Sequence, residues 1–363
     1  MFFQRVHIQS FRNIQALTFE PSRGLNVIEG RNGQGKTSLL EALNLTTSLR
    51  SFRGHPTKDL IQLNADRSAV LARFHSNLET RDVELTLAGN RRSLRVNGDK
   101  VASLNDYFGH VRMVTFIPDD VAVFRAGPAE RRLFFDRIIF GLLPAYAAES
   151  SRYEAVLKQR NALLRHETPD LRLLDVYDEQ LADAAVVVAK RRTELVDVLR
   201  EPLKTAFYEV FGAGFDVEVL YETPCHSAAA ALTQLQQLRR HDLQRGHTSF
   251  GPHRDDFAVS LNGQPFKNYG SQGQHRALVL ACKIAEMRLL KEKTGSWPIL
   301  LMDDISSELD PLRNQKLFSF LSALDTQVFL TTTSRETLHL PGNYALWYMK
   351  EGDLTHENLS PVL

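Results

Sequence analysis

Hydrophobic positions change their spacing along the chain, and these changes predict its elements. The apolar run at 25–29 ends at Gly30, and apolar residues recur at helical spacing from Lys36 onward. Apolar and polar residues then alternate at 83–98, interrupted by two glycine-containing turns, and a further apolar stretch covers 111–117. Alternation with a period of two is typical of strands. The first third is therefore predicted to be strands with one helix, and 83–98 to be an antiparallel meander.

The middle of the chain is predicted to be largely helical. Pro128 follows Gly127 and Glu130 lies two residues later, an arrangement that favours a helix start. Long amphipathic stretches predict several helices, and two shorter alternating stretches predict strands. The helices are expected at 129–146, 150–166, 172–208 and 227–241, and the strands at 215–221 and 256–261.

The last third returns to alternating helices and strands. Helical spacing at 272–292 and 312–324 precedes two continuous apolar runs, at 299–302 and 328–330. Apolar runs without alternation suit strands that are covered on both faces, as in a parallel sheet. The predicted fold class is α/β, with an antiparallel β meander and a second, largely helical lobe.

The charge balance limits how this chain could bind nucleic acid. Its 363 residues include 44 Lys and Arg against 43 Asp and Glu, a net charge of +1. Proteins that hold nucleic acid through bulk charge are strongly basic, so any such site here must be local or assembled on demand. Two cysteines exclude a disulfide framework and fit a reducing cytosol, so a cytoplasmic location is expected. No apolar run is long enough to span a membrane.

A glycine-rich loop between the first buried strand and the first helix has the pattern G-x-x-x-x-G-K-T. In such a loop backbone N–H groups point at phosphate oxygens, Lys36 reaches the β- and γ-phosphates, and the Thr37 hydroxyl binds Mg²⁺. The helix N-terminus adds its dipole. ATP contacts are expected from Gly30, Arg31, Asn32, Gly33, Gln34, Gly35, Lys36, Thr37 and Ser38.

Two adjacent carboxylates follow the apolar run at 299–302. Asp303 is predicted to hold Mg²⁺ with Thr37, and Asp304 to orient or deprotonate the attacking water. The pair lies far downstream of Lys36, so a whole domain must be inserted between the two halves of the site. We therefore expect a split ATPase core lobe at 1–118 and 285–363, and an inserted helical lobe at 119–284.

A second segment has the features of an anion site at a helix start. Ser271-Gln272-Gly273-Gln274 lies just before a predicted helix, with glycines on both sides of Ser271. Since one loop already holds the phosphates, this segment is most useful if it serves the nucleotide of another subunit. Two further segments each allow a structural and a functional interpretation. Segment 307–310 could be a helix cap or part of the site, and segment 331–334 could be a strand end or a γ-phosphate contact.

Together these motifs resemble the ATPase head of ABC and SMC proteins, and more specifically the RecF family of bacterial recombinational repair proteins. The resemblance runs almost from end to end. It includes the glycine-rich loop, the carboxylate pair and the Ser271–Gln274 segment. It also includes Phe11-Arg12-Asn13, Leu40-Glu41-Ala42, Ser51-Phe52-Arg53, Pro128 with Arg131, Arg132 and Asp136, Gln159-Arg160-Asn161, and Gly251-Pro252-His253-Arg254-Asp255-Asp256.

The resemblance implies a two-lobed head that sandwiches ATP and Mg²⁺ between two subunits. Ser271 of one subunit would face the γ-phosphate held by the other, so Lys36, Asp304 and Ser271 are the expected catalytic residues. It also implies ATP-dependent DNA binding, at duplex DNA and at single-strand/duplex junctions, and slow, DNA-dependent ATP hydrolysis. Cooperation with RecO and RecR in RecA loading at single-strand gaps is implied as well.

This chain departs from the wider ABC pattern at three places. Gln272 stands where transporters have Gly, and Asp304 stands where most ABC proteins have Glu. A shorter carboxylate reaches less far, which is consistent with slow hydrolysis. No switch histidine follows the last buried strand, and Asp119 or Asp120 occupies the region of the usual Gln, so the γ-phosphate sensor is left open.

Several basic residues are candidate DNA contacts, although a solvated face is the commoner role of such residues. The candidates are Arg91, Arg92, Arg95 and Lys100 on the meander, and Arg239, Arg240 and Arg245 further on. Arg131 and Arg132 lie in the first turn of a helix, a placement that predicts an anionic partner, an ion pair or, equally, a solvated face. Segment 253–256 could likewise be a ligand site or a salt-bridge corner.

Two other functions are compatible with these motifs. The chain could be the nucleotide-binding subunit of a transporter, with the inserted helices docked on a membrane partner. It could also be a scaffold that binds ATP without useful hydrolysis.

Overall fold

A computed structural model describes residues 1–49, 51–76, 79–101, 107, 111–212, 214–304, 311–322, 324–338, 340 and 343–357. It divides the chain into two compact units. Unit 1 comprises Met1–Val121, Glu209–Gly212 and Gln272–Leu363, and unit 2 comprises Ala122–Tyr208 and Ala213–Ser271. The sequence places the boundaries at 118/119 and 284/285, whereas the second boundary here precedes the helix at 272–294, which belongs wholly to unit 1.

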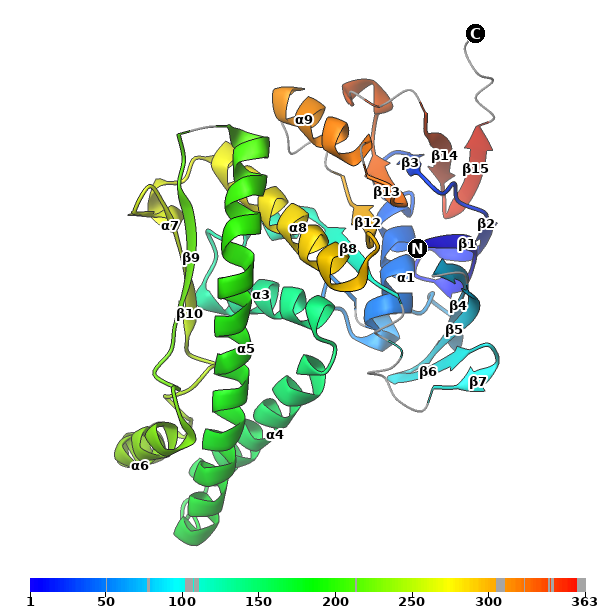
Figure 1. Ribbon diagram of the computed structural model, residues 1–363. Helices are drawn as coiled ribbons and strands as arrows, with labels where there is room; N and C mark the ends of the chain where they lie inside the picture. The colour runs from blue at the N-terminus through cyan, green and yellow to red at the C-terminus, as the bar shows by residue number, and fades with distance from the viewer. Residues whose placement is uncertain are drawn as a thin grey trace. The chain divides into compact units, whose positions relative to one another are not determined.

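The first sheet of unit 1 contains the strands that lead into the nucleotide motifs. Its order is β15-β14-β3-β13-β12-β8, and the five strands from β14 to β8 run parallel to one another (Figure 1). These strands are β3 Leu25–Glu29, β8 Met113–Phe116, β12 Ile299–Met302, β13 Val328–Thr332, β14 Ala345–Lys350 and the antiparallel edge strand β15 Asp353–Glu357. The continuous apolar runs are thus confirmed as parallel strands, and the last hairpin was not expected.

The second sheet of unit 1 is antiparallel and has the order β2-β1-β4-β5-β6-β7. Its strands are β1 Phe2–Phe11, β2 Ile14–Phe19, β4 Arg67–Ser76, β5 Glu79–Ala88, β6 Arg91–Val96 and β7 Asp99–Lys100. The predicted meander is the β5–β7 part of this sheet. Strands β1, β2 and β4 extend it with the same alternation of buried and exposed side chains.

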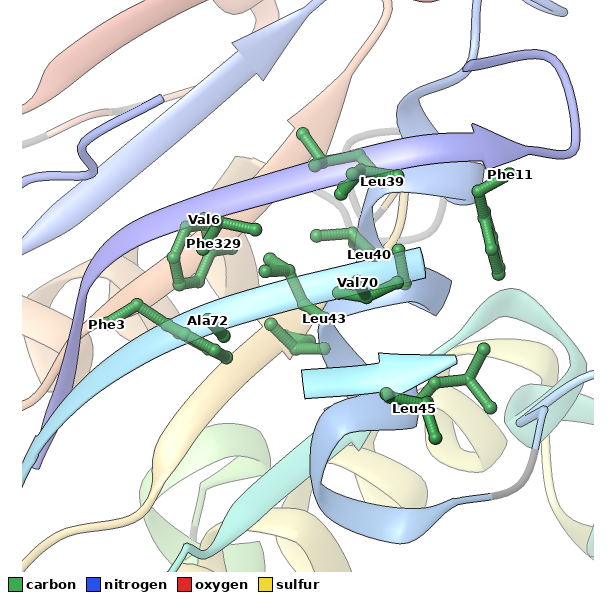
Figure 2. Close-up of a cluster of buried hydrophobic side chains, with 14 of the residues drawn as sticks. Phe3, Val6, Phe11, Leu39, Leu40, Leu43, Leu45, Val70, Ala72 and Phe329 are labelled. Carbon is green, nitrogen blue, oxygen red and sulfur yellow. The ribbon is translucent and has the colours of Figure 1, made fainter. Parts of the chain in front are cut away.

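Helix α1, Lys36–Ser48, contacts β1, β4 and β5 of the antiparallel sheet and β8 and β13 of the parallel sheet. Leu39, Leu40 and Leu43 are fully buried in this core, and Figure 2 shows them with Phe3 of β1 and Phe329 of β13. The apolar faces of both sheets are therefore joined by the helix that begins at the glycine-rich loop. The remaining elements of unit 1 are α8 Gln272–Thr294, α9 Pro311–Ser322 and the 3₁₀ helices Thr57–Leu60, Pro118–Ala122 and Arg335–Thr337.

Unit 2 is built from long helices and a small sheet, as the spacing predicts (Figure 1). Helix α3 has Gly127 as its N-cap and Pro in its first turn, which confirms the predicted start. The helices of unit 2 are α3 Pro128–Leu142, α4 Tyr146–Leu164, α5 Leu171–Phe211, α6 Ala228–Arg245 and α7 Phe266–Tyr269. The last residues of α5 fall in unit 1. The sheet has the order β11-β10-β9, with β9 Val217–Glu222, β10 Asp256–Leu261 and β11 Gln264–Pro265. Among the described residues, no helix has the length and apolar character needed to cross a membrane.

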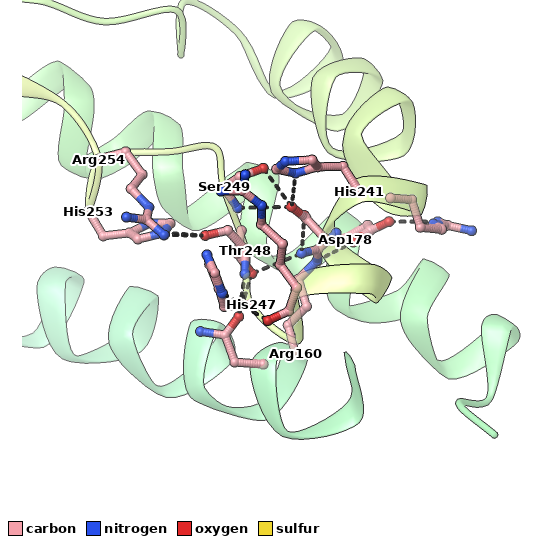
Figure 3. A network of polar contacts seen from close by, with 12 residues as sticks. Arg160, Asp178, His241, His247, Thr248, Ser249, His253 and Arg254 are labelled. Carbon is pink, nitrogen blue, oxygen red and sulfur yellow. Dashed lines mark hydrogen bonds and ion pairs between the residues drawn. The ribbon is translucent and has the colours of Figure 1, made fainter. Parts of the chain in front are cut away.

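A buried ionic network joins α4, α5 and α6 within unit 2. Arg160 is fully buried, and its Nε lies 2.6 Å from Asp178 Oδ1 while one terminal nitrogen lies 2.8 Å from Asp242 Oδ2. The same nitrogen donates to Thr248 Oγ1 at 2.8 Å, and Asn161 Oδ1 accepts from the Thr248 amide (Figure 3). Arg160 of α4 therefore holds α5 and α6 through their buried carboxylates. This is the structural role of the arginine in the Gln159-Arg160-Asn161 motif.

Candidate nucleotide site

The glycine-rich loop follows β3 and leads directly into α1, the context that its sequence requires. A Cβ at Gly30 would lie 2.4 Å from the Met349 carbonyl oxygen, so only glycine fits beside β14. Gly35 has φ +111°, and a Cβ there would meet the Asn13 amide and the Met349 side chain at 2.9 Å. These two glycines let the loop pass close to neighbouring backbone, which leaves its N–H groups at the N-terminus of α1.

Lys36 is buried and lies across the loop. Its Nζ donates to the Gly30 carbonyl and, at 3.1 Å, to the Arg31 carbonyl. Burial lowers the pKa of Lys36, and the carboxylates of Asp304 and Asp303 act in the opposite direction. The buried ammonium is thus held within the loop, where its positive charge would favour an anionic phosphate.

Asp303 and Thr37 meet across the loop, although they are far apart in the sequence. Thr37 Oγ1 donates to the Asp303 carboxylate, with distances of 3.0 Å to Oδ1 and 2.9 Å to Oδ2. Burial raises the pKa of Asp303, while hydrogen bonds from Thr331 and Thr37 and the charge of Arg53 oppose that rise. A hydroxyl and a buried carboxylate are oxygen donors of the kind that Mg²⁺ prefers.

These two side chains fit a Mg²⁺ that takes its other ligands from nucleotide and water. Among the described residues there is no group of three or more His, Cys, Asp and Glu that could hold a metal alone. Magnesium usually keeps several waters and binds through one or two carboxylates plus substrate phosphates. The donor set therefore agrees with a metal that arrives with the nucleotide.

Thr331 and Asp304 complete this end of the parallel sheet. Thr331 Oγ1 donates to Asp303 Oδ1 at 2.7 Å and accepts from the Asp304 amide at 2.9 Å. Asp304 has φ +45°, a left-handed conformation that a non-glycine residue adopts at some cost. In the 331–334 segment, Thr331 therefore holds the Asp303 carboxylate and the Asp304 backbone through its hydroxyl.

Asn13 holds the loop from the turn between β1 and β2, a role that sequence reasoning did not assign. Its Oδ1 accepts from Ser38 Oγ at 2.8 Å, and its Nδ2 donates to the Gly33 carbonyl at 3.4 Å. In the sequence, Asn13 stands out only as part of the Phe11-Arg12-Asn13 motif, because no local pattern predicts that this turn packs on the glycine-rich loop.

The hairpin of β14 and β15 contacts the loop at Gln34. The amide of Glu351 donates to Gln34 Oε1 at 2.7 Å, and the amide of Gly352 donates to the Gln34 carbonyl at 2.9 Å. Such contacts join residues more than three hundred positions apart. The sequence shows only a Glu-Gly turn there, with no sign of its partner.

Arg53 is a further basic residue of this site. One of its terminal nitrogens lies 4.0 Å from Asp303 Oδ2, and its side chain is 41% exposed. The Ser51-Phe52-Arg53 motif therefore delivers a positive charge to the carboxylate that faces Thr37. This role was also missed, because the motif by itself has no spacing that points to a phosphate or a metal.

The Ser271–Gln274 segment stands at the start of α8. Ser271 is the last residue of unit 2 and is exposed, and Gln272 opens the 23-residue helix. An exposed helix N-terminus leaves Ser271 accessible to another molecule.

The 307–310 segment lies outside the described residues. Asp120 serves a turn, since its carboxylate accepts from the Ile117 amide at 3.3 Å.

The candidate DNA contacts fall into two groups. Arg91, Arg95 and Lys100 are exposed, and Arg95 is directly opposite Lys100 in the β6–β7 pair, so these two share one face of the sheet with Arg91. Arg92 is on the opposite face and donates to the Leu49 carbonyl. Arg239 is paired with Asp175 and Asp178 at 2.6 Å each, whereas Arg240 and Arg245 are exposed. The pairing of Arg92 and Arg239 argues against them as DNA contacts.

Ion pairs account for the basic residues at the start of α3. Arg131 makes a bidentate pair with Asp256, at 2.8 and 2.7 Å, and Arg132 donates to the Asp255 carbonyl at 2.7 Å. His253 lies between the Tyr153 hydroxyl and the Thr248 carbonyl, and burial lowers its pKa. These contacts favour the salt-bridge corner over a ligand role for segment 253–256.

Comparison with known proteins agrees with the head fold. Residues 2–355 match the RecF/RecN/SMC N terminal domain. The chain is 41% identical to the DNA replication and repair protein RecF of Geobacter sulfurreducens, covering 98% of this chain and 100% of that one. It is 40% identical to the RecF of Myxococcus xanthus, covering 90% of each.

Solved structures give the same result. The recombination mediator protein RecF with ATP, from the RecFOR pathway, superposes with a TM-score of 0.89 at 28% identity, covering 98% of this chain and 97% of that one. An Smc head bound to the C-terminal winged-helix domain of ScpA superposes with a TM-score of 0.59 at 14% identity, covering 99% of this chain. The latter likeness concerns the fold alone. The expected mixed α/β ATPase head, with its antiparallel sheet and helical lobe, is confirmed.

Proposed function

Because the chain belongs to the RecF family of DNA replication and repair proteins, we propose that it is an ATP-dependent DNA-binding recombination mediator. It binds ATP with Mg²⁺, pairs two heads around the nucleotide and hydrolyses ATP slowly, in a DNA-dependent way. The observation that carries the proposal is the bond between Thr37 and Asp303 beside the buried Lys36. This bond supports the proposal because it joins a residue of the glycine-rich loop to a buried carboxylate, the two side chains proposed to hold Mg²⁺.

The residues of the site have separate roles in binding. Loop amides and the α1 N-terminus bind the phosphate oxygens, and Lys36 adds positive charge at the β- and γ-phosphates. Thr37 and Asp303 would hold Mg²⁺, which supplies charge neutralisation between those phosphates. Asn13 and Gln34 keep the loop in place through their bonds to Ser38 and the β14–β15 hairpin.

Asp304 is proposed to act on the attacking water. Its backbone is fixed by the Thr331 hydroxyl, and its charge acts on that of Lys36, so it belongs to the phosphate end of the site. A carboxylate there can orient a water or accept its proton. If Asp303 and Asp304 were dispensable and turnover stayed at background, the chain would instead be an ATP-binding scaffold.

The Ser271–Gln274 segment is proposed to complete the site of a second copy of the chain. Ser271→Arg is expected to abolish ATP-dependent dimerisation, because a long cation replaces a small hydroxyl at an exposed helix N-terminus. Nucleotide binding by the monomer is expected to be unchanged. Sizing by light scattering with ATP, with ADP and without nucleotide measures the first effect, and titration with a fluorescent ATP analogue measures the second.

Ser227→Arg is a matched control, since Ser227 caps α6 at another helix start. It is expected to leave ATP-dependent dimerisation intact. A Ser271→Arg protein that still dimerised with ATP would remove the trans role of the segment.

The outer face of β6 and β7 is proposed to contact DNA phosphates. Replacing Arg91, Arg95 and Lys100 by Gln is expected to reduce the slope of log K against log salt by about one for each phosphate that is no longer bound. Arg73→Gln on the same face is the control, because its guanidinium already pairs with Asp82 at 2.7 and 3.0 Å. Binding isotherms over a salt series measure the slope, and an unchanged slope removes this face from the proposal.

Cooperation with RecO and RecR in loading RecA at single-strand gaps is part of the proposed function, by membership of the family. The test of the whole proposal is binding to gapped and blunt duplex DNA with ATP, ADP or no nucleotide, beside the oligomeric state. Tighter binding to DNA with ATP, together with dimerisation, is expected. Binding indifferent to nucleotide, with co-purification of a membrane permease, would favour a transporter subunit instead.

A further inference from the structure

Glu41 is a fully buried carboxylate on α1, five residues after Lys36. It is bonded on two sides. Its carboxylate pairs with the Arg12 guanidinium, whose terminal nitrogen donates to Glu41 Oε1 at 3.0 Å. The Ser51 hydroxyl donates to the same Oε1. One helix position therefore contacts two separate segments of unit 1, one before α1 and one after it.

The contact with Arg12 leads to the glycine-rich loop. Arg12 has φ +51° in the turn between β1 and β2, and its amide donates to the Leu60 carbonyl at 2.9 Å. Its neighbour Asn13 bonds Ser38 and the Gly33 carbonyl. Holding Arg12 thus holds the turn that supports the loop.

The contact with Ser51 leads to the metal end of the site. Ser51 Oγ accepts from the amides of Arg53 at 3.1 Å and His55 at 3.3 Å, which fixes the backbone of this segment. Arg53 carries its guanidinium to within 4.0 Å of Asp303. The path from Glu41 to Asp303 therefore consists of two hydrogen-bonded steps and one ion pair.

We infer that Glu41 is a positioning residue that sets Arg53 beside Asp303 through Ser51. This inference rests on the proposed nucleotide function. A buried charge without a partner destabilises the folded protein, so the Glu41 carboxylate stays in contact with both Arg12 and Ser51. Glu41 contacts no phosphate itself, and its effect on ATP turnover passes through Arg53.

The first arm of the test needs no nucleotide. Hydrogen exchange of the Arg53 and His55 amides is measured in wild type, Glu41→Gln, Ser51→Ala and Glu286→Gln. Glu286 is a buried carboxylate of unit 1, paired with Lys283 on α8, and controls for neutralising such a group. Faster exchange at these two amides is expected in Glu41→Gln and Ser51→Ala, and exchange at the wild-type rate is expected in Glu286→Gln. Exchange equal to wild type in Ser51→Ala and Glu41→Gln would overturn the inference.

The second arm is a double-mutant cycle on ATP turnover. Glu41→Gln and Arg53→Ala are each expected to lower turnover by about 10–100-fold, as for residues that orient metal ligands. The double variant is expected to be no slower than the slower single variant, because both changes remove one function. Ser51→Ala, which leaves the Arg12 pair in place, is expected to follow Glu41→Gln and guards against a folding defect.

Multiplied effects in the double variant would mean that Glu41 acts apart from Arg53, and would overturn the inference. If wild type hydrolyses no ATP, the proposed function fails, while the exchange of the Arg53 and His55 amides still decides the positioning role.

Discussion

Replacing Lys36 with methionine is expected to lower ATP turnover by about 10²–10³-fold, the cost of removing one preorganised charge-stabilising donor. Methionine keeps an unbranched apolar stem but has no ammonium. The Gly30 and Arg31 carbonyls lose their donor, and the carboxylates of Asp303 and Asp304 lose the opposite charge of Lys36. Steady-state phosphate release at saturating ATP and Mg²⁺, with and without DNA, measures the change.

Lys158→Met is the matched control, since Lys158 is an exposed lysine on α4 of unit 2. Its turnover is expected to equal that of wild type. If Lys36→Met also hydrolysed ATP at the wild-type rate, the glycine-rich loop would not be the hydrolytic site, and the proposed mechanism would be wrong.

Replacing Arg160 with methionine is expected to destabilise unit 2 by about 3–5 kcal/mol, the usual cost of removing one partner from a buried charge network. Asp178 and Asp242 are both fully buried, and Arg160 contacts each of them. Without the guanidinium, Asp178 keeps Arg239, while Asp242 keeps the hydrogen bonds from the amide and hydroxyl of Ser249 and a contact of 3.8 Å with His241 Nδ1. The helices α4, α5 and α6 would then pack around two buried carboxylates that have lost their shared guanidinium.

Urea unfolding followed by helical circular dichroism measures this loss. The two tryptophans, Trp297 and Trp347, lie in unit 1, so their fluorescence reports that unit separately. Arg239→Met is the control and is expected to cost less, because Arg239 is partly exposed and Arg160 still pairs with Asp178. A loss of about 1 kcal/mol or less for Arg160→Met, the range of exposed ion pairs, would contradict a buried role.

The nucleotide motifs could be predicted because each depends on neighbours in the sequence. The loop from Gly30 to Thr37 carries its own glycines, lysine and threonine, and the strands on either side of the insertion are continuous apolar runs. Asp303 could be placed beside Thr37 because parallel strands end at one edge of their sheet, and the structure brings them to 2.9 Å.

The supports of the site could not be predicted in the same way. Asn13 and the Glu351-Gly352 turn contact the loop, and Thr331 contacts Asp303, from segments that are distant in the chain. A turn residue has the same local sequence whether or not a loop packs on it. The antiparallel sheet was underestimated for a related reason, since short half-buried strands such as β1 and β4 depend on pairing partners.

The basic residues illustrate what only the tertiary structure decided. In the sequence, Arg91 and Arg239 are equally plausible DNA contacts, but Arg239 is paired with two aspartates and Arg91 is on an open sheet face. The sequence by itself determined the glycine-rich loop between a strand and a helix, the buried strand before Asp303 and the helical lobe, because periodicity and motif spacing are local properties. Which charges are already neutralised depends on side chains that meet only after folding, and so the free basic surface belongs to the tertiary structure.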